Sequence, residues 1–200
     1  MIAFLLKGGV LMAPILLCSV IALAVIIERF IKIRSSKIMP QDFLDEVQDL
    51  VQKRKISEAE VVCKNNNSPM AGILLKAIQS FGQGRDVIKE KIEEVGKREI
   101  AGLEKGCGLL GTIASITPLL GLLGTVFGMI KVFNDIAFQG VGNANSLAGG
   151  ISEALITTAA GLSIAIPTLV AYRYFLGRIE GLVHVMEERS REIVDLLGEK

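Results

Sequence analysis

Long apolar runs alternate with charged segments along this chain. Three runs, over residues 8–27, 107–130 and 147–172, contain at most one charged side chain each. The hydrocarbon core of a bilayer is about 30 Å thick, and a helix needs about 20 residues to cross it. In lipid, only helices and closed barrels satisfy all backbone hydrogen bonds. The runs lack the alternation of apolar and polar residues that is typical of barrel strands, so we expect helices. The pattern predicts an all-α membrane protein with three transmembrane helices.

The first run also invites comparison with a cleaved signal peptide, because it follows Lys7 at the N-terminus. Three features oppose that reading. The run is long for a signal sequence, it ends in Ile26-Ile27-Glu28-Arg29 instead of small residues, and its strongest positive charge lies after it. A retained helix is therefore the better interpretation.

Lys and Arg cluster after the first and third runs, whereas the link between the second and third carries only Lys131. The positive-inside rule then predicts an outer N-terminus and an inner C-terminus. The predicted divisions are a short outer N-terminus and transmembrane helix 1 (1–28), a cytoplasmic helical region (29–105), transmembrane helix 2 (106–139), a periplasmic hairpin loop (140–146), transmembrane helix 3 (147–175) and a cytoplasmic C-terminal helix (176–200).

The cytoplasmic region has helical periodicity and recognisable helix ends. Phe43, Val47, Leu50 and Val51 share one helical face. Ser57 with Glu60 resembles a capping box, and Ser68-Pro69 suits an N-cap followed by the first helical turn. We expect breaks at 65–67 and 82–84, which are rich in Asn and Gly.

Helical periodicity also runs into and out of the membrane runs. Apolar residues from Ile88 to Leu103 predict a helix that continues into the second run, and those from Ile179 to Ile193 predict that the third run continues beyond the membrane. The apolar stripes of these long cytoplasmic extensions must pack on each other or on neighbouring subunits.

Composition and motifs argue against several kinds of chemistry. Half of the residues are hydrophobic and the net charge is +1, which gives no reason to expect nucleic-acid binding. The run GCGLLG at 106–111 follows no strand and opens a membrane helix, so it does not indicate a nucleotide site. Cys18, Cys63 and Cys107 lack metal-ligand spacing, and His184 lies among charges. We expect no enzyme activity, no cofactor and no metal.

Small residues recur on the second and third runs. Gly121, Gly124, Gly128 and Gly161 would let two helix backbones approach closely, which is how helices associate in lipid. We predict that these glycines pack the two helices together.

Hydroxyl groups on the same two runs are a second feature. Most Ser and Thr in membrane helices bond to their own backbone. With Gly142 as the hairpin tip, Thr125 lies 17 residues before it and Thr158 lies 16 after it, so an antiparallel pair would hold both at similar depth. Thr157 lies one helical turn from Glu153.

Glu153 is the one charged residue inside the third run. A carboxylate in lipid costs a few kcal/mol and is by default a functional hypothesis. Two bland alternatives remain: a position near the interface, and a structural bond to a neighbouring helix. We expect no Lys or Arg partner at that depth within one chain, and this expectation favours an oligomer with a polar lumen.

Two stretches resemble the MotA/TolQ/ExbB proton channel family, nearest to its ExbB and TolQ branch. They are ITPLLGLLGTVFG at 116–128 and GISEALITTAAGLSIAIP at 150–167. Gly8-Gly9, Met12, Pro14-Ile15 and Ile27-Glu28-Arg29 resemble the first-helix pattern of the family.

The resemblance implies a homopentamer in the bacterial inner membrane around two single-span helices of the ExbD or TolR type. Thr125, Thr158 and Glu153 match the family's pore-facing positions, and we add Thr157 to this proton-pathway set because of its spacing. A TonB- or TolA-like transducer would carry the work of proton flow to the outer membrane, in TonB-dependent import or a Tol-Pal system. Which branch applies, and whether Glu153 itself shuttles protons, stays open.

Two other functions remain as alternatives. A membrane ion or solute transporter could use Glu153 as a binding site, although transporters usually have more spans and inverted repeats. A membrane-anchored structural scaffold would explain the amphipathic helices, but it would need neither Glu153 nor the threonines within the bilayer.

Overall fold

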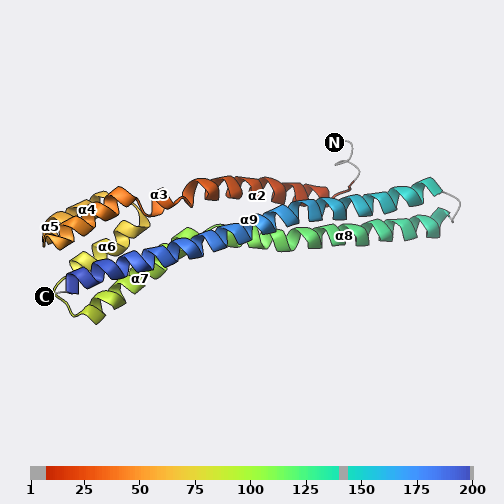
Figure 1. Ribbon diagram of the computed structural model, residues 1–200. Helices are drawn as coiled ribbons and strands as arrows, with labels where there is room; N and C mark the ends of the chain where they lie inside the picture. Colours follow the sequence, from red (N-terminus) through yellow and green to blue (C-terminus); the bar gives the residue numbers. More distant parts are fainter. Residues whose placement is uncertain (1–7, 140–143, 199–200) are drawn as a thin grey trace. The chain divides into compact units, whose positions relative to one another are not determined.

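The protein is helical throughout the part of the chain that the computed structural model describes, residues 8–139 and 144–198. No β-strand occurs in that part. The helices are α2 (Met12–Lys32), α3 (Ser35–Ile38), α4 (Gln41–Gln52), α5 (Ile56–Asn65), α6 (Pro69–Gln79), α7 (Arg85–Glu104), α8 (Cys107–Gln139) and α9 (Ala144–Gly198) (Figure 1). The all-α prediction is confirmed.

The helices form two compact units. The first combines the chain up to Glu28 with Gly106–Tyr174, and the second combines Arg29–Lys105 with Phe175–Lys200. The helix α9 contributes to both units, since it is one uninterrupted element of 55 residues.

In the first unit, α8 and the first part of α9 run side by side in opposite directions, and α2 completes the unit (Figure 1). Among the described residues, three helices are long and apolar enough to cross a membrane: Met12–Lys32, Cys107–Phe138 and a stretch within Leu147–Gly198. Large apolar side chains are exposed on each of them, including Val20 at 67%, Leu119 at 63% and Leu155 at 63%. Such surface is suited to lipid or to other membrane helices, and it would be unfavourable in water.

The second unit has a conventional hydrophobic core. The helix α4 buries Phe43, Leu44, Val47 and Val51, and α6 buries a wider set: Met70, Ala71, Ile73, Leu74, Ala77 and Ile78. The face predicted for α4 is therefore confirmed, except that Leu50 is only half-buried.

Of the two predicted helix starts, the one at Ser68 is confirmed and the one at Ser57 is wrong. Ser68 caps α6 as expected, because its side chain accepts a hydrogen bond from the Ala71 N–H and Pro69 follows at the first turn. The capping box of Ser57 and Glu60 is wrong: α5 begins at Ile56, its N-cap is Lys55, and no side chain caps it. Of the expected breaks, 82–84 lies between helices, whereas the break at 65–67 begins one residue later than expected because Asn65 is the last residue of α5.

The expectation that one helix runs from residue 86 into the second membrane run is also wrong. The helix α7 ends at Glu104 and α8 begins at Cys107. Gly106, between them, has a φ of +91°, a left-handed conformation that glycine adopts without strain and that no helix contains. After the third apolar run the helix does continue, since α9 reaches Gly198.

The hairpin between the second and third membrane helices is shorter than predicted. The helix α9 begins at Ala144, so 144–146 are helical and not part of the loop. Gly142, taken above as the tip, lies outside the described residues.

Candidate site at the α8–α9 contact

Glycines bring α8 and α9 into backbone contact. A Cβ added to Gly161 would lie 2.7 Å from the Thr117 carbonyl oxygen, and one added to Gly128 would lie 2.7 Å from the Ala154 Cβ and 3.0 Å from the Gly150 carbonyl oxygen. Real Cβ atoms do not approach other atoms so closely, so larger residues would force the helices apart. Gly121 and Gly124 face Thr158 and Thr157 in the same contact. All four glycines predicted to pack helices therefore lie at this contact.

Thr158 makes a hydrogen bond from one helix to the other. Its Oγ1 donates to the carbonyl oxygen of Gly121 over 2.8 Å. Thr125, which lies one turn further along α8 from Gly121, donates instead to the carbonyl oxygen of Leu122 in its own helix. Because Gly124 packs on Thr157, the contacts place Thr125 and Thr158 within about one helical turn of each other in depth.

Most of the other hydroxyl groups bond to their own helix, as the sequence suggested. Thr112, Ser115, Thr117 and Thr168 each donate to the carbonyl oxygen four residues earlier. This bond satisfies the hydroxyl without any partner helix. Thr158 and Thr157, by contrast, bond to the backbone of another segment, at Gly121 and Gly8.

Thr157 is enclosed by its own chain and is only 1% exposed. Its Oγ1 lies 2.8 Å from two carbonyl oxygens, those of Gly8 and Glu153, which share its single hydroxyl hydrogen. A side chain in that position supports the turn that precedes α2. Thr157 thus joins α9 to this turn, and its place in a proton pathway, like that of Glu153, Thr125 and Thr158, stays a prediction.

Glu153 has a basic partner on α8, which the sequence analysis did not expect. Lys131 Nζ lies 2.9 Å from Glu153 Oε2 in an ion pair. The expectation of no Lys or Arg at this depth was wrong, and with it the argument that an unpaired carboxylate requires an oligomer. Glu153 is 27% exposed and Lys131 is 61% exposed.

The histidine and the three cysteines, to which the sequence analysis assigns no role beside Glu153 and the threonines, differ in their burial. His184 is exposed, Cys63 and Cys107 are buried, and Cys18 is intermediate. Among the described residues, no group of His, Cys, Asp or Glu could hold a metal ion.

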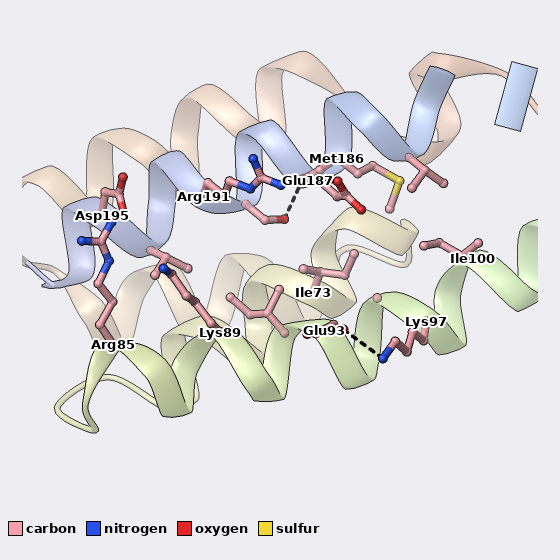
Figure 2. Close-up of a pocket in the computed structure, with 15 residues that line it drawn as sticks. Ile73, Arg85, Lys89, Glu93, Lys97, Ile100, Met186, Glu187, Arg191 and Asp195 are labelled. Atoms are coloured by element: carbon pink, nitrogen blue, oxygen red, sulfur yellow. Dashed lines mark hydrogen bonds and ion pairs between the residues drawn. The ribbon is translucent and has the colours of Figure 1, made fainter. Parts of the chain in front are cut away.

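The second unit contains a cavity of about 450 Å³ between α7 and the last part of α9. Figure 2 shows ion pairs around it, including Arg85 with Asp195 across the two helices and Glu93 with Lys97 along α7. Ile73 and Met186, which are buried, form part of its apolar lining. The two apolar stripes left without a partner in the sequence analysis therefore face each other within one chain.

Comparison with known proteins places the chain in a class of membrane channels. The MotA/TolQ/ExbB proton channel family matches over residues 65–188, a range that includes the α8–α9 contact. The chain belongs to this family, and the resemblance stated from its motifs is confirmed.

Several relatives carry ExbB or TolQ names. The Synechocystis biopolymer transport protein ExbB-like 1 is 38% identical over 177 residues, covering 84% of this chain and 67% of that protein. ExbB-like 3 of the same organism is 31% identical, covering 93% of this chain and 90% of that protein. The Tol-Pal system protein TolQ of Pseudomonas aeruginosa is 42% identical over 43% of this chain and 37% of its own length. Together with the three apolar helices, these matches identify a multi-pass membrane protein of the ExbB/TolQ type.

Proposed function

We propose that this protein is the channel-forming subunit of a complex that couples proton flow to mechanical work on the cell envelope. Five copies would surround two single-span helices of an ExbD- or TolR-like partner. A TonB- or TolA-like transducer would pass the work on. The observation that carries the proposal is the cluster at the α8–α9 contact, where Glu153 and Thr158 lie in a candidate membrane span.

The chemistry of the cluster suits a proton pathway. A threonine hydroxyl has one donor and two acceptor positions, so Thr158 and Thr125 could pass hydrogen bonds along without changing charge. Moving one proton through a potential of 100 mV releases about 2.3 kcal/mol, which can bias a conformational step. No covalent chemistry is required, in keeping with a family that is not known for enzymes.

Because Glu153 is paired with Lys131 of its own chain, the support for an oligomer comes from the exposed apolar surface of α8. Exposed leucines and phenylalanines cover α8, among them Leu122 at 58%, Phe127 at 56% and Phe133 at 62%. Copies of α8 and α9 around a common axis would cover some of this surface and leave the rest to lipid. The glycines, in this arrangement, build each subunit and do not join one subunit to the next.

The proposed topology follows the charge distribution. In the bacterial inner membrane, the N-terminus and residues 140–143 would face the periplasm, whereas α3–α7 and the end of α9 would lie in the cytoplasm. Arg29, Lys32, Arg34 and Lys37 then mark the cytoplasmic end of the first span.

Two measurements test the proposal. Native mass spectrometry of the detergent-purified chain, alone and co-expressed with a single-span partner, is expected to show five copies that retain two partner helices. Proteoliposomes of that complex are expected to conduct protons when a potential is applied.

The same measurements separate the proposal from its alternatives. A monomer or dimer that ignores the partner would contradict the channel proposal. Flux of a solute without the partner would favour a transporter, and an assembly that conducts nothing would favour a scaffold.

A further inference from the structure

Lys131 and Glu153 form an ion pair between two candidate membrane spans. Lys131 belongs to the span Cys107–Phe138, and Glu153 lies near the start of the third apolar stretch. The distance of 2.9 Å joins Nζ to one carboxylate oxygen, Oε2. Asp135, one turn further along α8, also acts electrostatically on Lys131. The pair therefore crosses from α8 to α9 at the level of the candidate pathway.

The other oxygen of the carboxylate lies against the turn before α2. A Cβ added to Gly9 would overlap Glu153 Oε1, and Gly9 has a φ of +69°, which favours glycine for a second reason. The turn is attached to α9 beside this point, because Thr157 donates to the Gly8 carbonyl oxygen over 2.8 Å. Both oxygens of Glu153 thus lie against atoms of its own chain, one on α8 and one on the glycine turn.

This arrangement has a consequence for the charge of the pathway. A lone carboxylate or a lone ammonium group in a membrane span costs a few kcal/mol, whereas paired charges offset each other. Losing either partner would leave the other exposed to that cost. The glycine turn also limits the positions that the carboxylate can take.

We propose that Lys131 is a positioning residue for Glu153: it neutralises the carboxylate and holds it on α8, with the Gly8–Gly9 turn closing the other side. Only the link to proton conduction rests on the proposed function; the ion pair itself does not. Glu153 is in this view a fixed, paired group of the channel wall.

The test uses the reactivity of Glu153 in the complete protein in native membranes. Dicyclohexylcarbodiimide reacts with protonated carboxyl groups in apolar surroundings, and peptide mass spectrometry reports how much Glu153 is modified. We expect slow modification of the wild type, modification several-fold faster in Lys131→Met, and wild-type behaviour in Lys131→Arg, which keeps the charge. Lys105→Met, which removes a lysine outside the three apolar runs, is the matched control and is expected to behave as wild type.

Equal modification of wild type and Lys131→Met would overturn the proposal. If Lys131→Met does not accumulate, Gly9→Ala provides a second test. The added methyl group must displace the Glu153 carboxylate, while both Lys131 and Glu153 are still present. Gly9→Ala is expected to raise modification of Glu153, and wild-type modification in that variant would contradict the contact with the turn.

Proton flux in proteoliposomes separates this inference from the proposed function. If the wild type conducts, Lys131→Met is expected to conduct several-fold less and Lys131→Arg to restore the flux. If no variant conducts but the modification rates differ as expected, the proposed function fails and the pairing stands. If the wild type conducts and modification is the same in all variants, the pairing fails and the proposed function stands.

Discussion

Thr158 on α9 donates its hydroxyl hydrogen to the carbonyl oxygen of Gly121 on α8, over 2.8 Å. The absence of a side chain at Gly121 makes this approach possible, since a Cβ there would lie 3.0 Å from the Thr158 Cα. The same glycine thus brings the helices together and exposes the carbonyl that receives the bond. Gly121 therefore serves both the packing of the two helices and the hydrogen bond from Thr158. A substitution that tests the hydrogen bond must leave the packing unchanged.

Thr158→Val meets this requirement, because valine keeps the shape of threonine and removes the hydroxyl. Interhelical hydrogen bonds in a membrane protein average about 0.6 kcal/mol, so the free energy of unfolding should fall only slightly. Proton flux in proteoliposomes with the partner should instead be abolished. Thr112→Val is the matched control, because the Thr112 hydroxyl donates to the Gly108 carbonyl oxygen of its own helix. Wild-type flux in Thr158→Val, with the oligomer intact, would remove Thr158 from the pathway.

Glu153→Ala should also abolish flux, for a different reason. It removes the carboxylate and leaves Lys131 without its ion-pair partner. The oligomer should stay assembled by native mass spectrometry, because the substitution leaves unchanged the exposed apolar side chains of α8, such as Leu122 and Phe127, that would lie between copies. Full flux in an assembled Glu153→Ala complex would contradict the role of Glu153 in the pathway.

Gly161→Ala should weaken the α8–α9 contact. The added methyl group would lie 2.7 Å from the Thr117 carbonyl oxygen, which is backbone and cannot turn aside. Overpacking of this kind costs about 1–3 kcal/mol, measured as a lower thermal midpoint in detergent. Gly177→Ala is the matched control on the same helix, because a Cβ at Gly177 meets no atom within 4 Å. It should raise the midpoint slightly, since alanine favours a helix by about 0.5–1 kcal/mol over glycine. Equal midpoints for the two variants would show that the contact tolerates a larger residue.

The sequence predicted this contact better than it predicted the partner of Glu153. The spacing of the glycines and the length of the apolar runs can both be read from neighbouring residues in the sequence. They were enough to predict that α8 packs beside α9. The hairpin arithmetic that brought Thr125 to Thr158 applies equally to Lys131, which lies 11 residues before Gly142, and to Glu153, which lies 11 after it. The signal for the ion pair was therefore in the sequence, but Lys131 was used only as evidence for topology.

Two other features could not be predicted so directly. The break at Gly106 depends on a positive φ, whereas the apolar periodicity on either side of it is uninterrupted. The contact between Gly8 and Thr157 joins residues 149 positions apart, and no local pattern reports such a distance along the chain. Tertiary packing decides both.

Ser68→Ala should destabilise the second unit through the loss of an N-cap. Ser68 accepts a hydrogen bond from the Ala71 N–H at the start of α6, whose apolar face fills the core. Replacing such a cap by alanine typically costs about 1 kcal/mol. Ser57→Ala is the control, because Ser57 is exposed within α5 and caps nothing. Thermal melts should show a lower midpoint for Ser68→Ala and an unchanged or slightly higher one for Ser57→Ala, and a loss in the second variant would restore the capping box rejected above.

Cys63 should make the free energy of unfolding fall at alkaline pH. Burial raises the pKa of the Cys63 thiol to about 12, with a smaller contribution from the negative charge of Glu60. An unfolded thiol ionises near a pKa of about 8.5, so above that pH the unfolded chain loses a proton that the folded chain keeps. Stability is then independent of this thiol at neutral pH and decreases as the pH rises from about 8.5 towards 12. Cys63→Ala should show a shallower decrease over the same range. Alkylation by iodoacetamide at about pH 9 should modify Cys63 far more slowly in the folded protein than in urea, because the thiolate is the reactive form. Equally fast modification in both states would mean that the thiol is neither buried nor shifted.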